Sequence, residues 1–343
     1  MKIIRFLLFP ISILYNAITA IRNLFFDIGI FKQTSFELPI IAVGNLSVGG
    51  TGKTPQIEYL IRLLKNKQVA TLSRGYKRKT KGFLLIGKQH IVEEVGDEPM
   101  QFYKKFKDIL VAVDADRTNG IKQLLVTKKR PEVILLDDAF QHRKVKAGFY
   151  ILLTKYNDLF ADDFVLPTGN LRESRSGAKR ADIIVVTKCP ENLSEKEQEK
   201  LRNKIPLIKN QQLFFSCINY SEYLIGKEQQ IKLQDLKEKE LLVVTGIASP
   251  QSLLEFLSTQ KITYKHLSYP DHHHFTESDI KIIEKELKVL ETNEKMIVTT
   301  EKDYVRLEGR LDNLFYLPIE SKFLTHKEQF DKRILNYVQK QGC

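Results

Sequence analysis

The chain has 343 residues, of which 43% are hydrophobic and 28% are charged. This composition is that of a globular protein and excludes a disordered chain, and the length is sufficient for two domains that each bury a core. The three cysteines are far apart in sequence and indicate neither a disulfide framework nor a zinc site, which fits a reducing compartment.

The formal net charge of +12 indicates an anionic partner. Phosphate-rich nucleic acid and an anionic membrane surface are the two candidates. The basic residues come in short clusters, such as 77–81 and 128–130, and no nucleic-acid motif accompanies them. We therefore expect no nucleic-acid partner, and we interpret each single cluster as a solvated surface.

Residues 1–26 begin the chain with an apolar segment that carries no charge between Arg5 and Arg22. The 16 residues between these arginines are fewer than the roughly 20 that a helix needs to cross a bilayer. The polar residues of the segment are spaced by four, three and four positions and so form one stripe of a helix: Ser12, Asn16, Thr19 and Asn23. The rest of the circumference is apolar.

We interpret residues 1–30 as an amphipathic helix in a membrane interface. Apolar burial holds such a helix, together with the attraction of Lys2, Arg5 and Arg22 to anionic headgroups. A signal peptide is one alternative, because Lys2 and Arg5 precede an apolar stretch. A helix buried in the protein core is the other.

The stretch Ser47-Val-Gly-Gly-Thr-Gly-Lys-Thr54 follows a strand-like apolar run and precedes a segment with apolar residues at helical spacing. Strand, glycine-rich turn, Lys-Thr and helix form the context of a phosphate-binding P-loop, although Ser47 replaces its first glycine. Backbone N–H groups at a helix N-terminus bind phosphate, Lys53 is expected to reach the β- and γ-phosphates, and Thr54 to bind Mg²⁺. The predicted nucleotide-binding residues are Ser47, Gly49, Gly50, Thr51, Gly52, Lys53 and Thr54.

From residue 40 to about 190, apolar runs alternate with helical segments. Several runs are continuously apolar, as in a parallel sheet that is covered on both faces. Ligands of such sheets bind beyond the carboxyl ends of the strands. The predicted strands are Ile40–Val43, Val69–Leu72, Ile109–Val113, Val133–Leu136, Tyr150–Leu153 and Ile183–Val186.

Asp137 and Asp138 directly follow one of these predicted strands. On a chain with a P-loop, this pattern indicates that an aspartate holds Mg²⁺, directly or through water. An Asp pair at this place is also typical of a helix cap. Which of the two carboxylates contacts the metal stays open.

The α/β pattern resumes after short strand-like pieces between residues 207 and 233. We therefore predict an α/β fold: a P-loop NTPase core with a mostly parallel sheet, a second smaller α/β domain, a short antiparallel β connector between them and the N-terminal membrane-associated helix. The predicted divisions are the helix at 1–30, the P-loop domain at 31–212, the connector at 213–235 and the smaller domain, contributing to the active-site cleft, at 236–343.

The predicted smaller domain contains Asp271-His272-His273-His274. Three adjacent histidines cannot all face one metal ion, and no cysteine lies near them in sequence. An aspartate followed by a histidine at a strand end can orient an imidazole for proton transfer. A polar loop is the alternative, and His273 and His274 stay without a role.

The motifs taken together resemble the tetraacyldisaccharide 4′-kinase (lipid A 4′-kinase) family. They follow the family's order over roughly residues 40 to 305. Ala139-Phe140 stands where other members often have Gly-Leu. The motifs are Val43-Gly44-Asn45 with 49–54, Ser73-Arg74-Gly75-Tyr76, Gly96-Asp97-Glu98-Pro99, Asp137-Asp138, Gln141-His142, Leu166-Pro167 with Gly169, Arg172-Glu173, Thr245-Gly246-Ile247-Ala248, Asp271-His272 and Thr300-Glu301-Lys302-Asp303.

The resemblance implies a kinase that uses ATP and Mg²⁺ to phosphorylate the 4′-hydroxyl of a tetraacylated glucosamine disaccharide 1-phosphate in lipid A biosynthesis. It implies that Asp97 is the base for this hydroxyl, that His272, oriented by Asp271, assists it, and that Lys53 takes part in catalysis. The expected contacts to substrate or phosphate are Arg117, Gln141, His142, Arg172 and Glu173.

The same resemblance places the enzyme at the cytoplasmic face of the inner membrane, as a peripheral or monotopic protein without an obligate protein partner. The alternative is a membrane-associated P-loop NTPase that acts as a switch or assembly factor. That alternative explains the P-loop and the N-terminal helix, but it gives Asp97 and His272 no role.

Overall fold

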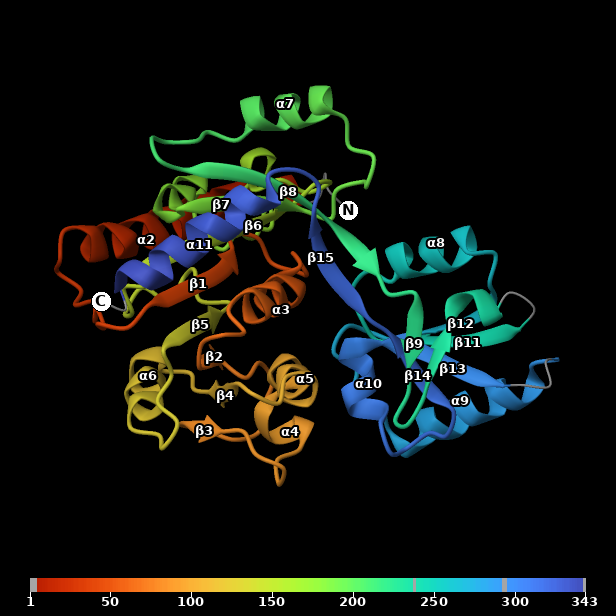
Figure 1. Ribbon diagram of the computed structural model, residues 1–343. Coiled ribbons are helices and arrows are strands. Elements are labelled where there is room, and N and C mark those ends of the chain that lie inside the picture. The colour runs from red at the N-terminus through yellow and green to blue at the C-terminus, as the bar shows by residue number, and fades with distance from the viewer. Residues whose placement is uncertain (1–4, 237–238, 292–294, 342–343) are drawn as a thin grey trace.

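Two β-sheets lie side by side in the computed structural model, which describes residues 5–236, 239–291 and 295–341 (Figure 1). The large sheet has nine strands in the order β15-β8-β7-β6-β1-β5-β2-β4-β3, and the small sheet has six in the order β10-β9-β14-β13-β11-β12. Helices α5 (Asp97–Lys105) and α10 (Glu301–Leu307) face one another where the two sheets meet (Figure 1). The predicted α/β fold is confirmed.

The large sheet is parallel except at its two edges. All six apolar runs predicted between residues 40 and 190 are strands of it, which confirms the parallel arrangement. Its strands are β1 (Ile40–Asn45), β2 (Val69–Ser73), β3 (Leu84–Leu85), β4 (Leu110–Val113), β5 (Val133–Asp137), β6 (Phe149–Lys155), β7 (Ile183–Thr187), β8 (Gln212–Tyr220) and β15 (Ile319–Phe323).

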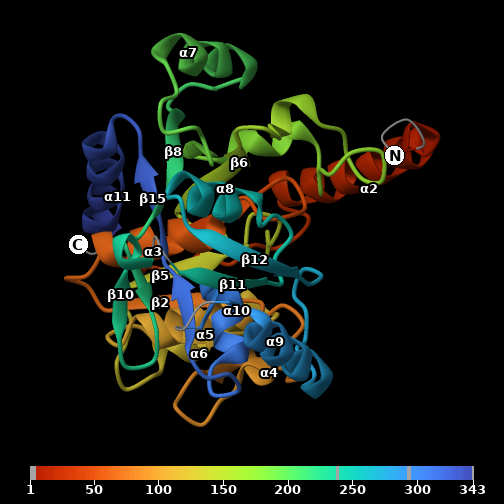
Figure 2. The ribbon, with the colours of Figure 1, turned by 90° about the vertical axis from the view of Figure 1, so that its right-hand side faces the viewer.

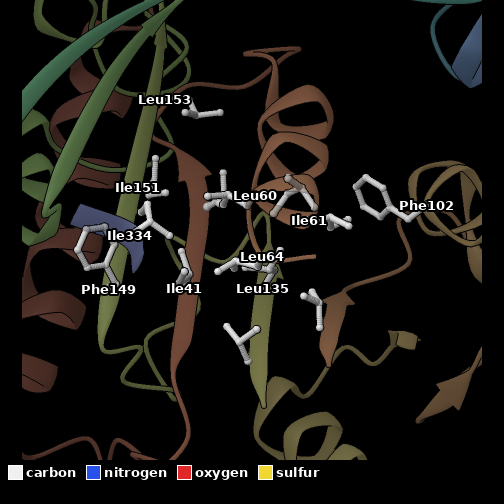
Figure 3. Close-up of a cluster of buried hydrophobic side chains, with 14 of the residues drawn as sticks. Ile41, Leu60, Ile61, Leu64, Phe102, Leu135, Phe149, Ile151, Leu153 and Ile334 are labelled. Carbon is white, nitrogen blue, oxygen red and sulfur yellow. The ribbon is translucent and has the colours of Figure 1, made fainter. Parts of the chain in front are cut away.

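Alternate residues of the central strands enter two different hydrophobic cores. Ile41 and Val43 of β1 pack on one face, against the P-loop helix α3 (Lys53–Leu63), α5 (Asp97–Lys105) and α11 (Lys327–Gln341) (Figure 3). Ile40 and Ala42 pack on the other face, against α6 (Arg117–Leu125). Each fully buried Ile or Leu stabilises the folded state by about 1.5–3 kcal/mol. Burial on both faces therefore holds the strands, and with them the residues at their carboxyl ends, in place.

The small sheet repeats the α/β pattern on a smaller scale. Its strands are β9 (Tyr223–Ile225), β10 (Gln230–Lys232), β11 (Glu240–Thr245), β12 (Thr263–Ser268), β13 (Met296–Thr300) and β14 (Leu314–Leu317). Further helices among the described residues are α4 (Val92–Val95), α7 (Glu195–Lys204), α8 (Gln251–Thr259), α9 (Glu277–Val289) and α10 (Glu301–Leu307), with short 3-10 helices at Phe160–Asp162, Arg175–Arg180 and Leu233–Leu236.

The last part of the chain returns to the large sheet, which differs from the predicted division at 236–343. Strand β15 pairs antiparallel with β8, and Phe330, Ile334 and Val338 of α11 enter the core of the large sheet. The predicted connector at 213–235 is also divided, because β8 belongs to the large sheet and β9 and β10 to the small one. Two crossings of the chain therefore join the sheets.

Ser12 and Asn23 of the polar stripe attach the N-terminal helix α2 (Phe9–Asp27) to the protein, while most of its apolar side is exposed. The Ser12 hydroxyl is buried and donates to Thr168 Oγ1 at 2.7 Å, and Asn23 Nδ2 donates to Glu173 at 2.7 Å. Ile13, Leu14 and Ile18 are each more than half exposed, so the alternative of a buried core helix is wrong. Figure 2 shows α2 projecting from the rest of the molecule, and by length and composition it could cross a membrane. Lys2 lies outside the described residues.

Candidate active site

The P-loop joins β1 to α3, and residues 170–172 contact its first part through backbone hydrogen bonds and a β-bridge. Gly52 is the N-cap of α3 with φ of 83°, a left-handed conformation that a side chain would strain. Ser47, which replaces the first P-loop glycine, is buried and bridges to Leu171. The N–H groups of residues 49–52 donate no hydrogen bond to another described residue, so this loop offers donors to an anion at a helix N-terminus.

The two aspartates at the end of β5 have different surroundings. Burial raises the pKa of Asp137 to about 7, against the opposing effect of Lys53. Burial also acts on Asp138, but the Lys53 ammonium and the Arg172 guanidinium hold the pKa of Asp138 below its usual value. Asp138 Oδ1 is 3.4 Å from Lys53 Nζ and 3.0 Å from Arg172 Nη1.

Asp137 offers an oxygen that fits a magnesium ion. Its Oδ1 is buried without a hydrogen-bond partner among the described residues. An unpaired buried carboxylate oxygen is costly, and a hard cation that prefers oxygen ligands would satisfy it. Thr54, predicted as a metal ligand, is the second residue of α3, directly after the P-loop.

Asp97 and His272 come together from the two sheets. Asp97 begins α5 after Gly96, and His272 lies in the loop after β12, with φ of 57°. His272 Nδ1 is 2.7 Å from Asp97 Oδ2. Burial acts to raise the pKa of Asp97, but hydrogen bonds from His272 and Arg306 hold that pKa below its usual value.

Arg306 and Lys302 of α10 also contact the Asp97–His272 pair. Neither was given a role from the sequence. Arg306 donates to Asp97 Oδ1 from Nε at 2.6 Å and to Oδ2 from Nη2. Lys302 Nζ is 2.9 Å from His272 Nε2. Asp271, predicted to orient His272, is 3.9 Å from Nε2, so Lys302 rather than Asp271 is in hydrogen-bond contact with that nitrogen. Lys302 belongs to a motif already recognised, whereas no local signal marks Arg306.

Arg117 and His142 lie near Asp137, the last residue of β5, and their side chains are directed into the protein. Arg117 is buried and donates to the carbonyls of Asp114 and Asp137, and burial lowers its pKa to about 10. Burial, with Arg117 nearby, lowers the pKa of His142 to about 4. The His142 Nε2 atom is buried without a partner among the described residues.

Gln141 and Glu173 connect the P-loop strand to the N-terminal helix. Gln141 Nε2 donates to the Asn45 carbonyl and to Glu173, both at 2.9 Å. The Glu173 carboxylate is buried and also accepts from Asn23 and from Arg180, each at 2.7 Å. The structure therefore brings these two predicted contacts together, but with their hydrogen bonds directed to other protein groups.

Comparison with known proteins matches residues 4–339 to the family model described as tetraacyldisaccharide-1-P 4′-kinase. The chain belongs to this family. The tetraacyldisaccharide 4′-kinase of Flavobacterium johnsoniae is 57% identical over 99% of this chain and 98% of the relative, and that of Bacteroides fragilis is 45% identical over 97% and 93%. The crystal structure of the "apo" form of LpxK from Aquifex aeolicus in complex with ATP superposes with a TM-score of 0.79, at 33% identity, over 98% of this chain and 99% of that one.

Family membership confirms the resemblance found in the motifs, and with it the interpretation of the chain as a kinase. The structural match over nearly the whole chain confirms the P-loop α/β fold. The alternative of a switch or assembly NTPase gains no support from relatives that carry the kinase name.

Proposed function

We propose that this kinase moves the γ-phosphate of ATP to the 4′-hydroxyl of a tetraacylated glucosamine disaccharide 1-phosphate with Asp97 as the base. The observation that carries the proposal is the contact of Asp97 with His272, 2.7 Å apart and supplied by α5 and by the loop after β12. A hydroxyl is a poor nucleophile until a positioned base accepts its proton. A hydrolytic switch would need no such buried pair.

The donor half of the site is the P-loop with Lys53 and Arg172. The free N–H groups of residues 49–52 suit the phosphates of ATP, and Lys53 and Arg172 are held near the phosphate side by Asp138. Asp137, Asp138 and Thr54 would hold Mg²⁺, which supplies neutralisation of charge on the phosphates when bound. We assign Arg117, His142, Gln141 and Glu173 to the shape of this edge rather than to direct phosphate contact.

The acceptor half is the Asp97 carboxylate, whose two oxygens are not equivalent. Oδ2 accepts from His272 and Arg306, whereas Oδ1 accepts from Arg306 alone among the residues that the structure describes. Each carboxylate oxygen has two lone-pair sites, so Oδ1 keeps one for the substrate hydroxyl. The hydroxyl proton passes to Oδ1 as the hydroxyl oxygen bonds to the γ-phosphorus; the bond from that phosphorus to the bridging oxygen breaks, and ADP leaves.

The outward side of α2 is suited to contact with the acyl chains of the substrate. Apolar side chains there, including Ile13, Leu14 and Ile18, are exposed, while Ser12 and Asn23 of the polar stripe are hydrogen-bonded to the protein. A helix of this kind buries its apolar face in a membrane interface. We place the enzyme at the cytoplasmic face of the inner membrane, where its basic surface meets anionic headgroups.

A transfer assay tests the proposed function. Purified enzyme is incubated with γ-labelled ATP, Mg²⁺ and the tetraacyl disaccharide 1-phosphate in mixed micelles. We expect label in the lipid and none in a sample whose lipid already carries a 4′-phosphate. Label that appears only as inorganic phosphate would show that water, and not the lipid, is the acceptor.

A further inference from the structure

Lys302 contacts the ring nitrogen of His272 that does not face Asp97. Lys302 is the second residue of α10, whose first turn is capped by Thr300 Oγ1 accepting from the Asp303 N–H at 3.1 Å. Its Nζ is 2.9 Å from His272 Nε2 and 3.2 Å from Glu98 Oε1. The side chain is 21% exposed, so these contacts form in a partly buried place.

The hydrogen-bonding chemistry of lysine decides how the neutral His272 ring is protonated. An ammonium group only donates hydrogen bonds, and a neutral imidazole has one donor and one acceptor nitrogen. Nε2 must therefore accept from Lys302, and the ring proton must sit on Nδ1. From Nδ1 it points at Asp97 Oδ2, 2.7 Å away.

The other tautomer is disfavoured at both nitrogens. It would place an Nε2–H group against the Lys302 ammonium and an Nδ1 lone pair against the Asp97 carboxylate. Its one compensation is a hydrogen bond from Arg306 Nη2, which is 3.3 Å from Nδ1. That contact is longer than either bond that would be lost.

We propose that Lys302 is a positioning residue that fixes the His272 tautomer with its proton on Nδ1, directed at the base. The inference rests on the proposed role of Asp97. With this tautomer, His272 and Arg306 both donate to Asp97, so the Asp97 carboxylate is held ionised and in one orientation.

The same contact accounts for a cluster that resembles a metal site. Asp97, Glu98 and His272 lie close enough together to hold an ion. The Lys302 ammonium already contacts Glu98 and His272. We therefore assign the Lys302 ammonium, rather than a metal ion, as the cation that these groups contact.

Nitrogen NMR of the full-length protein labelled with ¹⁵N-histidine reads the tautomer directly, and His272→Gln identifies the His272 signals. We expect the proton on Nδ1 in the wild type, and a measurable share of it on Nε2 in Lys302→Met, where Asp97 alone still favours Nδ1. Lys302→Arg, which also only donates, keeps the Nδ1 proton. Glu98→Gln, which removes the ion pair but not the contact to His272, keeps it too. A wild-type ring protonated on Nε2, or an unchanged tautomer in Lys302→Met, would overturn the proposal.

The transfer assay provides the second readout. We expect kcat of Lys302→Met to fall about tenfold, because a misdirected ring weakens general-base catalysis, while KM for ATP changes less than about twofold; Lys302→Arg restores most of the rate. If Asp97→Asn transferred phosphate normally, the proposed role of Asp97 would fail, and the tautomer measured by NMR would still decide the role of Lys302.

Discussion

The carboxylate of Asp97 and the imidazole of His272 are 175 positions apart in sequence and 2.7 Å apart in space. One belongs to a helix of the large sheet and the other to a loop of the small sheet. The kinase therefore builds its proposed base at the junction of its two sheets. Changes that alter the contacts of this junction are expected to alter catalysis before they alter nucleotide binding.

Arg306→Met is expected to move the acid limb of the pH profile of kcat/KM for the lipid to higher pH. Burial acts to raise the pKa of Asp97, and Arg306 is one of the groups that lower it. A carboxylate base works only when ionised, so activity is lost as the pH falls through its pKa. Arg306→Lys keeps a positive charge and is expected to move the limb less.

The matched control for this change is Arg310→Met. Arg310 lies four residues later, beyond the end of α10, and pairs at 2.6 Å with Glu277, an exposed residue outside the site. Its Nη1 also donates to the Phe275 carbonyl at 2.6 Å. We expect this variant to keep the wild-type profile. An acid limb that stays in place in Arg306→Met would show that Arg306 does not act on the base.

Substitutions on the two sides of α2 are expected to change different properties. On the side that contacts the protein they change the free energy of unfolding, and on the outward side they change membrane binding. Asn23→Ala removes a donor from the buried Glu173 carboxylate, and an unsatisfied buried group costs about 1–3 kcal/mol. Ile18→Ser changes an exposed position and is expected to leave the free energy of unfolding within about 0.5 kcal/mol. Urea unfolding measures the first effect, and sedimentation with anionic vesicles measures weaker membrane binding by Ile18→Ser. If Ile18→Ser bound vesicles normally but unfolded easily, the outward side of α2 would be a protein contact.

Lys105→Met is expected to destabilise the protein by about 3 kcal/mol, because it leaves two buried carboxylates without their shared cation. Lys105 Nζ is 2.6 Å from Glu58 on the P-loop helix and 2.8 Å from Glu301 on α10. Lys67→Met is the control, since its pair with Glu132 is exposed and contributes at most about 1 kcal/mol. Equal losses in urea unfolding of the two variants would contradict the importance of the buried network.

Glu301 makes stability depend on pH between about 4.5 and 7. Burial, with Glu58 beside it, raises the pKa of Glu301 from 4.5 to about 7. Over this range the folded state binds more protons at Glu301 than the unfolded state, so its contribution to stability falls as the pH rises, by at most about 1.4 kcal/mol per pH unit. Asp137 acts with the same sign, so the difference between wild type and Glu301→Gln isolates Glu301. Parallel stability curves for the two proteins over this range would contradict the assignment.

Most of the large sheet could be predicted because its strands are buried on both faces, which leaves continuous apolar runs such as β1 and β7. Strand β15 gave no such signal. Its sequence Ile-Glu-Ser-Lys-Phe is an edge strand with exposed Glu320 and Lys322, and only its pairing with β8 defines it. The return of α11 to the first core likewise depends on tertiary packing that no local pattern carries.

Some residues of the candidate site could likewise be predicted from the sequence, and others could not. Asp97, His272 and the P-loop belong to motifs, so they could be named from the sequence. Arg306 could not, because nothing local separates it from Arg310, and its partner Asp97 is 209 positions away. Sequence also could not show that Glu173 already accepts hydrogen bonds from Gln141, Asn23 and Arg180.

Single-turnover transfer by Asp97→Asn tests the central claim most directly. Asparagine keeps the size of the side chain but removes the basic carboxylate. With excess enzyme and γ-labelled ATP, we predict that the labelling of the lipid slows by at least about 100-fold, while the Kd for ATP stays within about twofold of the wild-type value. Lipid labelling at the wild-type rate, or a loss of rate that follows entirely from lost ATP binding, would contradict the account.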